Sequence, residues 1–85
     1  MKYEVFKHYR DDMECEKEFT DLREALTYCF EDDTLCREGG HALSIRKNYT
    51  DSIFEINYYG NTEVNVDGIA TEEELNIIND FIKDI

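Results

Sequence analysis

The 85-residue sequence contains no proline and no tryptophan, and it has only four glycines. The missing proline and scarce glycine exclude collagen-like chains and proline-rich linkers. No run of apolar residues is long enough to cross a membrane. The first eight residues, MKYEVFKH, carry charges every few positions and do not resemble a secretory signal. We therefore expect a cytoplasmic protein that makes no direct contact with a membrane.

Basic residues are also scarce. Nine Lys and Arg stand against 21 Asp and Glu, which gives a formal net charge of −12. Such a charge repels phosphate backbones and anionic lipids, so direct binding of DNA, RNA or a lipid surface is not expected. Apolar residues make up 41% of the chain and aromatic residues 13%, enough for a folded core. We expect residues 1–85 to form one compact domain.

The cysteines do not form a recognisable metal or catalytic motif. Cys15, Cys29 and Cys36 contain no CxxC pair, and only His8 and His41 are available to join them as soft ligands. Cys29 and Cys15 are expected to face inward as reduced thiols. Cys36 and His41 are the only local thiol–imidazole pair, and no third group is placed to orient them. No cofactor, metal or enzymatic activity is predicted.

Apolar and polar residues alternate with the period of two that is typical of β-strands in five places. Residues 3–10 and 13–19 are expected to form a hairpin around a turn at residues 10–12. Three more strands follow, each separated from the next by turn-rich residues. They are predicted around residues 43–49, 54–58 and 64–66.

Two segments have the period of an amphipathic helix, and each begins with a capping box. Asp21 with Glu24 opens the first helix, which is expected to reach residues 34–36 and to end at Gly39-Gly40. Thr71 with Glu74 opens the second. The predicted order is β-β-α-β-β-β-α. Short connections favour antiparallel pairing, so we expect an α+β domain with both helices packed on one face of the sheet.

Acidic residues are predicted to line the other face of this sheet. Glu14, Glu16 and Glu18 alternate with Met13, Cys15 and Lys17, and should point outward together, about 6–7 Å apart. Exposed apolar side chains, among them Ile53, are expected on the same face as anchors. The predicted partner-binding residues are Glu4, Asp11, Asp12, Glu14, Glu16, Glu18, Glu55 and Glu63, with Phe6 and Tyr59, and Asp67 is assigned to the outer face as well.

The charge of −12 exceeds the magnitude of roughly 2–8 that keeps a small domain soluble. In size, composition and carboxylate layout the chain resembles the small acidic proteins with which bacteriophages and mobile elements block host defence, the anti-CRISPR and anti-restriction DNA mimics. The resemblance is one of class and carries over no functional residue. It implies a non-enzymatic inhibitor in the bacterial cytoplasm that binds a basic, nucleic-acid-binding protein such as a CRISPR effector. Its oligomeric state is not predicted.

Besides an accessory or interaction domain without an inhibitory role, two alternatives remain open at this point. The first is an immunity protein or antitoxin that neutralises a toxic nuclease, which sequence alone does not separate from an inhibitor. The second is a module that binds calcium or another small ligand, since Glu63, Asn65, Asp67, Gly68, Thr71 and Glu74 occupy positions 1, 3, 5, 6, 9 and 12 of a calcium-loop pattern. Against calcium, the first position holds Glu where the pattern asks for Asp, and a strand is predicted where a helix should enter. The other interpretation of this segment is a strand, a turn at Asp67-Gly68 and a capped helix.

Overall fold

The computed structural model describes residues 2–31, 41–49, 51–57 and 59–83. Its elements follow the predicted order. The strands are β1 (Tyr3–His8), β2 (Met13–Phe19), β3 (Ala42–Lys47), β4 (Ser52–Asn57) and β5 (Thr62–Val64), and the helices are α1 (Leu22–Glu31) and α2 (Glu72–Lys83). The expected extension of the first helix to residues 34–36, and its stop at Gly39-Gly40, lie outside the described residues.

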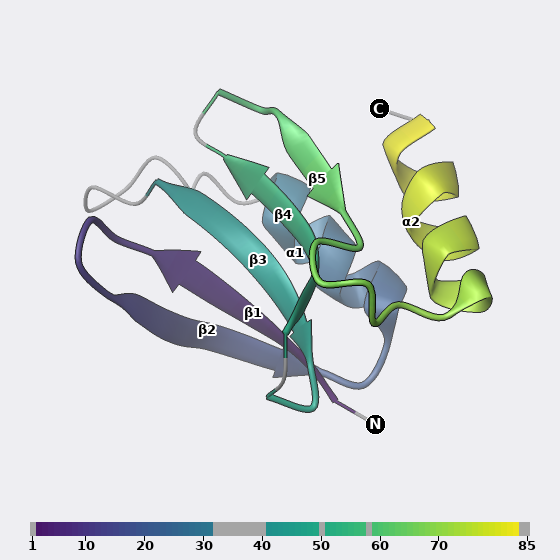
Figure 1. The fold of residues 1–85 in the computed structure, drawn as a ribbon, viewed down its shortest axis with the longest axis horizontal. Helices are drawn as coiled ribbons and strands as arrows, with labels where there is room; N and C mark the ends of the chain where they lie inside the picture. The colour runs from purple at the N-terminus through teal and green to yellow at the C-terminus, as the bar shows by residue number, and fades with distance from the viewer. Residues whose placement is uncertain (1, 32–40, 50, 58, 84–85) are drawn as a thin grey trace.

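The five strands form one antiparallel sheet in the spatial order β2-β1-β3-β4-β5. In Figure 1, α1 lies behind this sheet and α2 lies to one side of it, with no helix in front. The fold is the α+β domain that the sequence predicts. We call the face of the sheet turned away from α1 the open face. None of the described helices is long and apolar enough to span a membrane.

The core lies between the sheet and the helices. Val5, Ile45 and Phe54 are neighbours across β1, β3 and β4, and all three are fully buried. Leu26 of α1 is buried against this layer, and the ring of Phe30 lies 5.9 Å from that of Phe54. Apolar side chains at every second strand position and every third or fourth helix position therefore meet in one cluster.

Both helices begin at the predicted residues because side chains satisfy their first backbone N–H groups. The carboxylate of Asp21 accepts a hydrogen bond from the Arg23 N–H at 2.8 Å. At the start of α2 the capping box is reciprocal: the Thr71 N–H donates to Glu74 at 2.8 Å, and the Glu74 N–H donates to the Thr71 hydroxyl at 3.2 Å.

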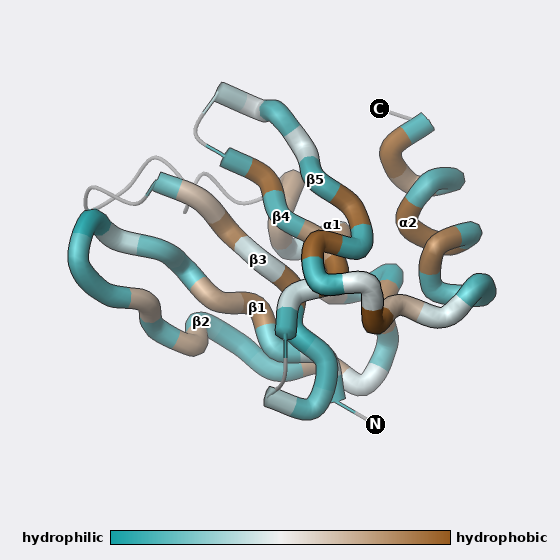
Figure 2. The backbone as a smooth tube through the Cα atoms, viewed as in Figure 1, coloured by the Kyte–Doolittle hydropathy of each residue, from teal (hydrophilic) through white to brown (hydrophobic). Residues whose placement is uncertain are grey.

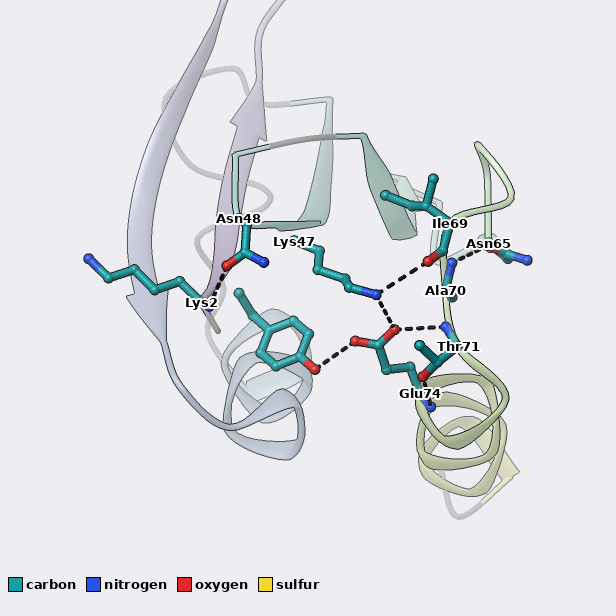
Figure 3. A network of polar contacts seen from close by, with 9 residues as sticks. Lys2, Lys47, Asn48, Asn65, Ile69, Ala70, Thr71 and Glu74 are labelled. Carbon is teal, nitrogen blue, oxygen red and sulfur yellow. Dashed lines mark hydrogen bonds and ion pairs between the residues drawn. The ribbon is translucent and has the colours of Figure 1, made fainter.

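Glu74 also attaches α2 to the sheet. Its carboxylate, 5% exposed as a residue, accepts hydrogen bonds from the Tyr3 hydroxyl at 2.7 Å and from Lys47 Nζ at 2.8 Å. Lys47 Nζ further donates to the Ile69 carbonyl at 3.3 Å (Figure 3). Burial raises the pKa of Glu74, but the hydrogen bonds from Lys47, Thr71 and Tyr3 outweigh it and leave the pKa below its ordinary value. Figure 2 shows α2 with brown, apolar bands alternating with teal, polar ones.

Candidate protein-interaction surface

A β-bulge in β2 determines which acidic side chains share a face. Val5 lies opposite Lys17, but the next residue of β1, Phe6, lies opposite Cys15. Glu16 is therefore the extra residue, without a partner of its own on β1. Because the bulge inserts one extra residue into a pattern of period two, residues before and after it that would have shared a face of the sheet lie on opposite faces.

The bulge splits the predicted row of three glutamates, so that prediction is wrong. Glu18 lies on the open face, opposite Glu4. Glu14 lies opposite Lys7, whose neighbours on β1 and β3 belong to the helix-covered face. Glu16 occupies the bulge itself and is partly exposed. Of these three carboxylates, only Glu18 stays at a paired position on the open face.

The same shift brings two apolar residues of β2, Cys15 and Met13, onto the open face. Cys15 lies opposite Phe6, and Met13 lies opposite His8. Cys15 is exposed and Met13 is 40% exposed, so the inward orientation predicted for both is wrong. Burial, and then the charges of Glu18 and Glu4, raise the pKa of the Cys15 thiol, which makes it a poor nucleophile.

Four carboxylates of the open face form two directly opposed pairs. Glu4 faces Glu18 across β1 and β2, and Glu55 faces Glu63 across β4 and β5. Like charges at directly opposite positions destabilise a sheet. Lys2 offsets part of the repulsion between Glu4 and Glu18, because its Nζ lies 3.7 Å from a carboxylate oxygen of Glu18.

Glu4 is not an exposed binding residue as predicted. Its side chain is fully buried, and one carboxylate oxygen accepts a hydrogen bond from the Tyr49 N–H at 2.6 Å. The other oxygen, Oε2, has no hydrogen-bond partner among the described residues. Burial, and then the charge of Glu18, raise the pKa of Glu4 above its ordinary value.

An aromatic and a cationic side chain stack beside this buried carboxylate. The ring of Phe6 meets that of Tyr49 edge-on, with centroids 6.4 Å apart, and the Arg46 guanidinium carbon lies 5.2 Å from the centroid of Phe6. Tyr49 is 58% exposed, and its left-handed backbone (φ 58°) belongs to the turn between β3 and β4. Phe6 is partly buried. No local sequence pattern predicts that Tyr49 and Arg46 lie beside Phe6.

His8 and Ser44 share a hydrogen bond on the open face, with His8 Nε2 2.7 Å from the Ser44 hydroxyl oxygen. Burial lowers the pKa of His8, Arg46 lowers it further, and Glu55 opposes the shift. The pair therefore adds no positive charge at neutral pH. Ser44 is only 1% exposed, so its hydroxyl is not accessible to a substrate.

The remaining predicted contact residues lie away from the centre of the open face. Asp11 and Asp12 are exposed in the turn between β1 and β2, where Asp12 accepts hydrogen bonds from Tyr9 and Met13. Tyr59 is 84% exposed in the turn between β4 and β5. Asp67 is exposed in the turn after β5. Ile53 is fully buried, which corrects its prediction as an exposed anchor.

The segment that matches a calcium loop is built as a strand, a turn and a capped helix. The Asn65 side chain accepts a hydrogen bond from the Ala70 N–H at 2.8 Å. Both carboxylate oxygens of Glu74 are already bound, to Thr71, Lys47 and Tyr3. The final Glu is thus not free to bind an ion through two oxygens, and the described residues hold no cluster of three or more metal-ligand side chains.

Neither of the two described thiols, Cys15 and Cys29, is suited to act as a nucleophile. Cys29 is buried on α1 as predicted, and burial raises its pKa to about 12. The predicted Cys36–His41 pair lies outside the described residues because Cys36 does.

Comparison with known proteins gives no relative to argue from: no protein-family model, curated protein or solved structure matches this chain. The functional argument therefore depends on the geometry of the open face.

Proposed function

We propose that this chain is a non-enzymatic inhibitor that binds a basic, nucleic-acid-binding protein through the open face of its sheet. The partner class is a host-defence nuclease such as a CRISPR effector, met in the bacterial cytoplasm. The proposal rests on one observation: two pairs of like-charged side chains, Glu4–Glu18 and Glu55–Glu63, stand directly opposite each other on the face that no described helix covers. A cationic partner would relieve the repulsion that each pair costs the free protein.

The spacing of these pairs supports a nucleic-acid-like surface. They occupy β1–β2 and β4–β5, with β3 between them. The strand spacing and residue rise place the nearest members, Glu4 and Glu55, roughly 12 Å apart and the centres of the two pairs roughly 16 Å apart. A duplex presents two phosphate backbones across a major groove about 12 Å wide. A basic cleft shaped for such a duplex would meet negative charge at both sides of this sheet.

The part of β1 and β2 beside the Glu4–Glu18 pair supplies apolar contact. Phe6, Cys15 and Met13 lie side by side there, and Tyr49 projects beside them. Apolar side chains surrounded by charged ones are the usual arrangement of a protein interface. The face therefore combines charge for orientation with apolar area for affinity.

The test begins with the immobilised protein and a lysate of a bacterial host. The protein retained is identified, purified and titrated against the inhibitor directly. We expect a basic nucleic-acid-handling protein whose binding weakens steeply with salt and is displaced by duplex DNA or RNA. Retention of proteins without nucleic-acid chemistry, or binding indifferent to competing DNA and RNA, contradicts the proposal.

Two triple variants then locate the surface. E18Q/E55Q/E63Q removes three carboxylates of the open face, and D67N/E72Q/D80N removes three exposed carboxylates elsewhere. We expect the first to weaken binding at least about tenfold and the second less than about threefold, since only local charge complements the partner. Equal affinities for the two variants would show that total charge, not the open face, drives binding.

A further inference from the structure

The sheet ends in an edge strand that is long and accessible. β2 is the outermost strand beside β1, and it has seven residues, whereas β5 at the other edge has three. No described residue pairs with the outer side of β2. Such an edge presents backbone N–H and C=O groups to which a further strand can bind.

Helix α1 lies beside the Phe19 end of this edge strand and forms a groove with it. The groove adjoins the end of β2 and is lined by Phe19, Arg23, Glu24, Thr27 and Tyr28. A second depression continues along the strand and is lined by Lys2, Lys17, Glu18, Phe19, Thr20 and Glu24. A chain laid along β2 would thus meet α1 at the Lys17–Phe19 end of the strand.

The floor of the groove is aromatic. The rings of Phe19 and Tyr28 lie 5.7 Å apart, and both residues are only partly buried. Lys17 Nζ lies 5.4 Å from the Phe19 ring and 5.7 Å from the Tyr28 ring, over both. Aromatic faces that already attract one ammonium group suit an apolar or cationic side chain from a partner.

Charge decides between a partner segment and a second copy of the chain. Self-pairing of β2 would bring Glu14, Glu16 and Glu18 of one copy against those of another, with Lys17 as the only basic residue on each strand. Like charges across a new strand pair oppose that association. A basic segment meets the same glutamates favourably.

We infer that β2 and the groove beside α1 bind an extended, basic segment of the partner protein, which adds to the sheet as a sixth strand. Because successive side chains of a strand alternate between faces, the segment would place apolar residues over Phe19 and Tyr28 and Lys or Arg beside Glu18. This inference rests on the proposed function and specifies how the partner is held.

A synthetic peptide tests the inference without the natural partner. The probe is a nine-residue peptide of alternating Val and Lys with blocked ends, titrated while the backbone amide resonances of the protein are recorded. We expect the largest changes in Met13–Phe19 and in the α1 residues of the groove. Methylation of alternate peptide nitrogens should weaken binding at least about tenfold, because it removes the donors that a strand pair needs.

Matched variants locate the site. T27R places a long basic side chain in the groove, and N76R makes the same charge change at an exposed position of α2. We expect T27R to weaken peptide binding at least about tenfold and N76R less than about threefold. Equal effects of the two variants, or tolerance of the methylated peptide, would overturn the inference.

Failure of the inference is distinguishable from failure of the proposed function. Resonance changes confined to β4 and β5 would place a basic ligand on the open face, which supports the proposed function and overturns the edge site. Changes in β2 that grow with protein concentration alone would identify a second copy as its occupant, which also overturns the edge site. Absence of peptide binding overturns it as well, whereas the proposed function is judged separately by the variant E55Q/E63Q, which changes the open face at β4 and β5 and leaves the edge site intact.

Discussion

Two glutamates are buried among the described residues, and their surroundings differ. Glu74, under α2, accepts hydrogen bonds from Tyr3, Lys47 and Thr71, and its pKa is lowered. Glu4, on the open face, accepts one from the Tyr49 N–H, lies opposite Glu18, and has a raised pKa. The first carboxylate is stabilised in its charged form and holds the fold together. The second is destabilised in its charged form by burial and by the neighbouring Glu18. The cationic partner proposed above would relieve this destabilisation.

Loss of the Glu74 carboxylate is expected to have the largest effect on stability. E74A removes the acceptor of the Tyr3 hydroxyl and the anionic partner of Lys47 in a partly buried site. Removing one partner of a buried pair costs about 3 kcal/mol or more of unfolding free energy. Urea denaturation at pH 7 measures this loss.

The pH dependence of this loss follows from the lowered pKa. Stability from Glu74 is complete above the pKa of an unfolded glutamate and is lost as the pH falls through the lower, folded pKa. The gap between wild type and E74A should therefore narrow in acid. The control is E73A, the exposed neighbour in the same helical turn, which forfeits only a helix-dipole contribution of about 0.5 kcal/mol. Equal losses for E74A and E73A would contradict the structural role of Glu74.

Glu74 also illustrates what the sequence predicts well. The spacing of Thr71 and Glu74 predicts a capping box because both partners lie within one helical turn, and the structure has it. The element order and the core faces of β1, β3 and β4 follow from local periodicity in the same way. Interactions between residues close in sequence need no knowledge of the tertiary fold.

The acidic row of β2 illustrates the opposite case. The alternation of residues 13–19 is regular, yet the bulge at Glu16 arises from how β2 pairs with β1, so it leaves no local pattern. The burial of Glu4 likewise depends on Tyr49, which is 45 residues away. The sequence therefore predicts an acidic open face, but not which carboxylates belong to it.

Neutralising Glu4 should raise stability moderately. E4Q keeps an oxygen to accept the Tyr49 N–H and removes a buried charge beside Glu18. A gain of about 1 kcal/mol at pH 7 matches the scale of one poorly satisfied buried group. Urea denaturation of E4Q and wild type, run side by side, measures the gain.

The raised pKa of Glu4 fixes how this gain varies with pH. The folded state holds the Glu4 proton to higher pH than the unfolded state, so wild-type stability falls as the pH rises from the ordinary glutamate pKa through the folded one. The advantage of E4Q should be smallest in acid and should grow toward neutral pH. An advantage that is constant with pH, or a loss of stability at pH 7, would contradict this account of Glu4.

The pair at the other side of the open face should give the smallest effect. Glu63 lies opposite Glu55, so E63Q removes a like-charge contact and should raise stability by about 0.5 kcal/mol at low salt. The matched control is E14Q on β2, where the same substitution removes a carboxylate opposite Lys7 and should lower stability by a similar amount. Thermal denaturation at about 20 mM and 500 mM salt measures both, and salt should shrink the two effects because it screens exposed charges. A salt-independent gain in E63Q, or a gain of equal size in E14Q, would mean that Glu55 and Glu63 do not specifically repel each other. The opposed pairs of the open face would then no longer support binding of a cationic partner.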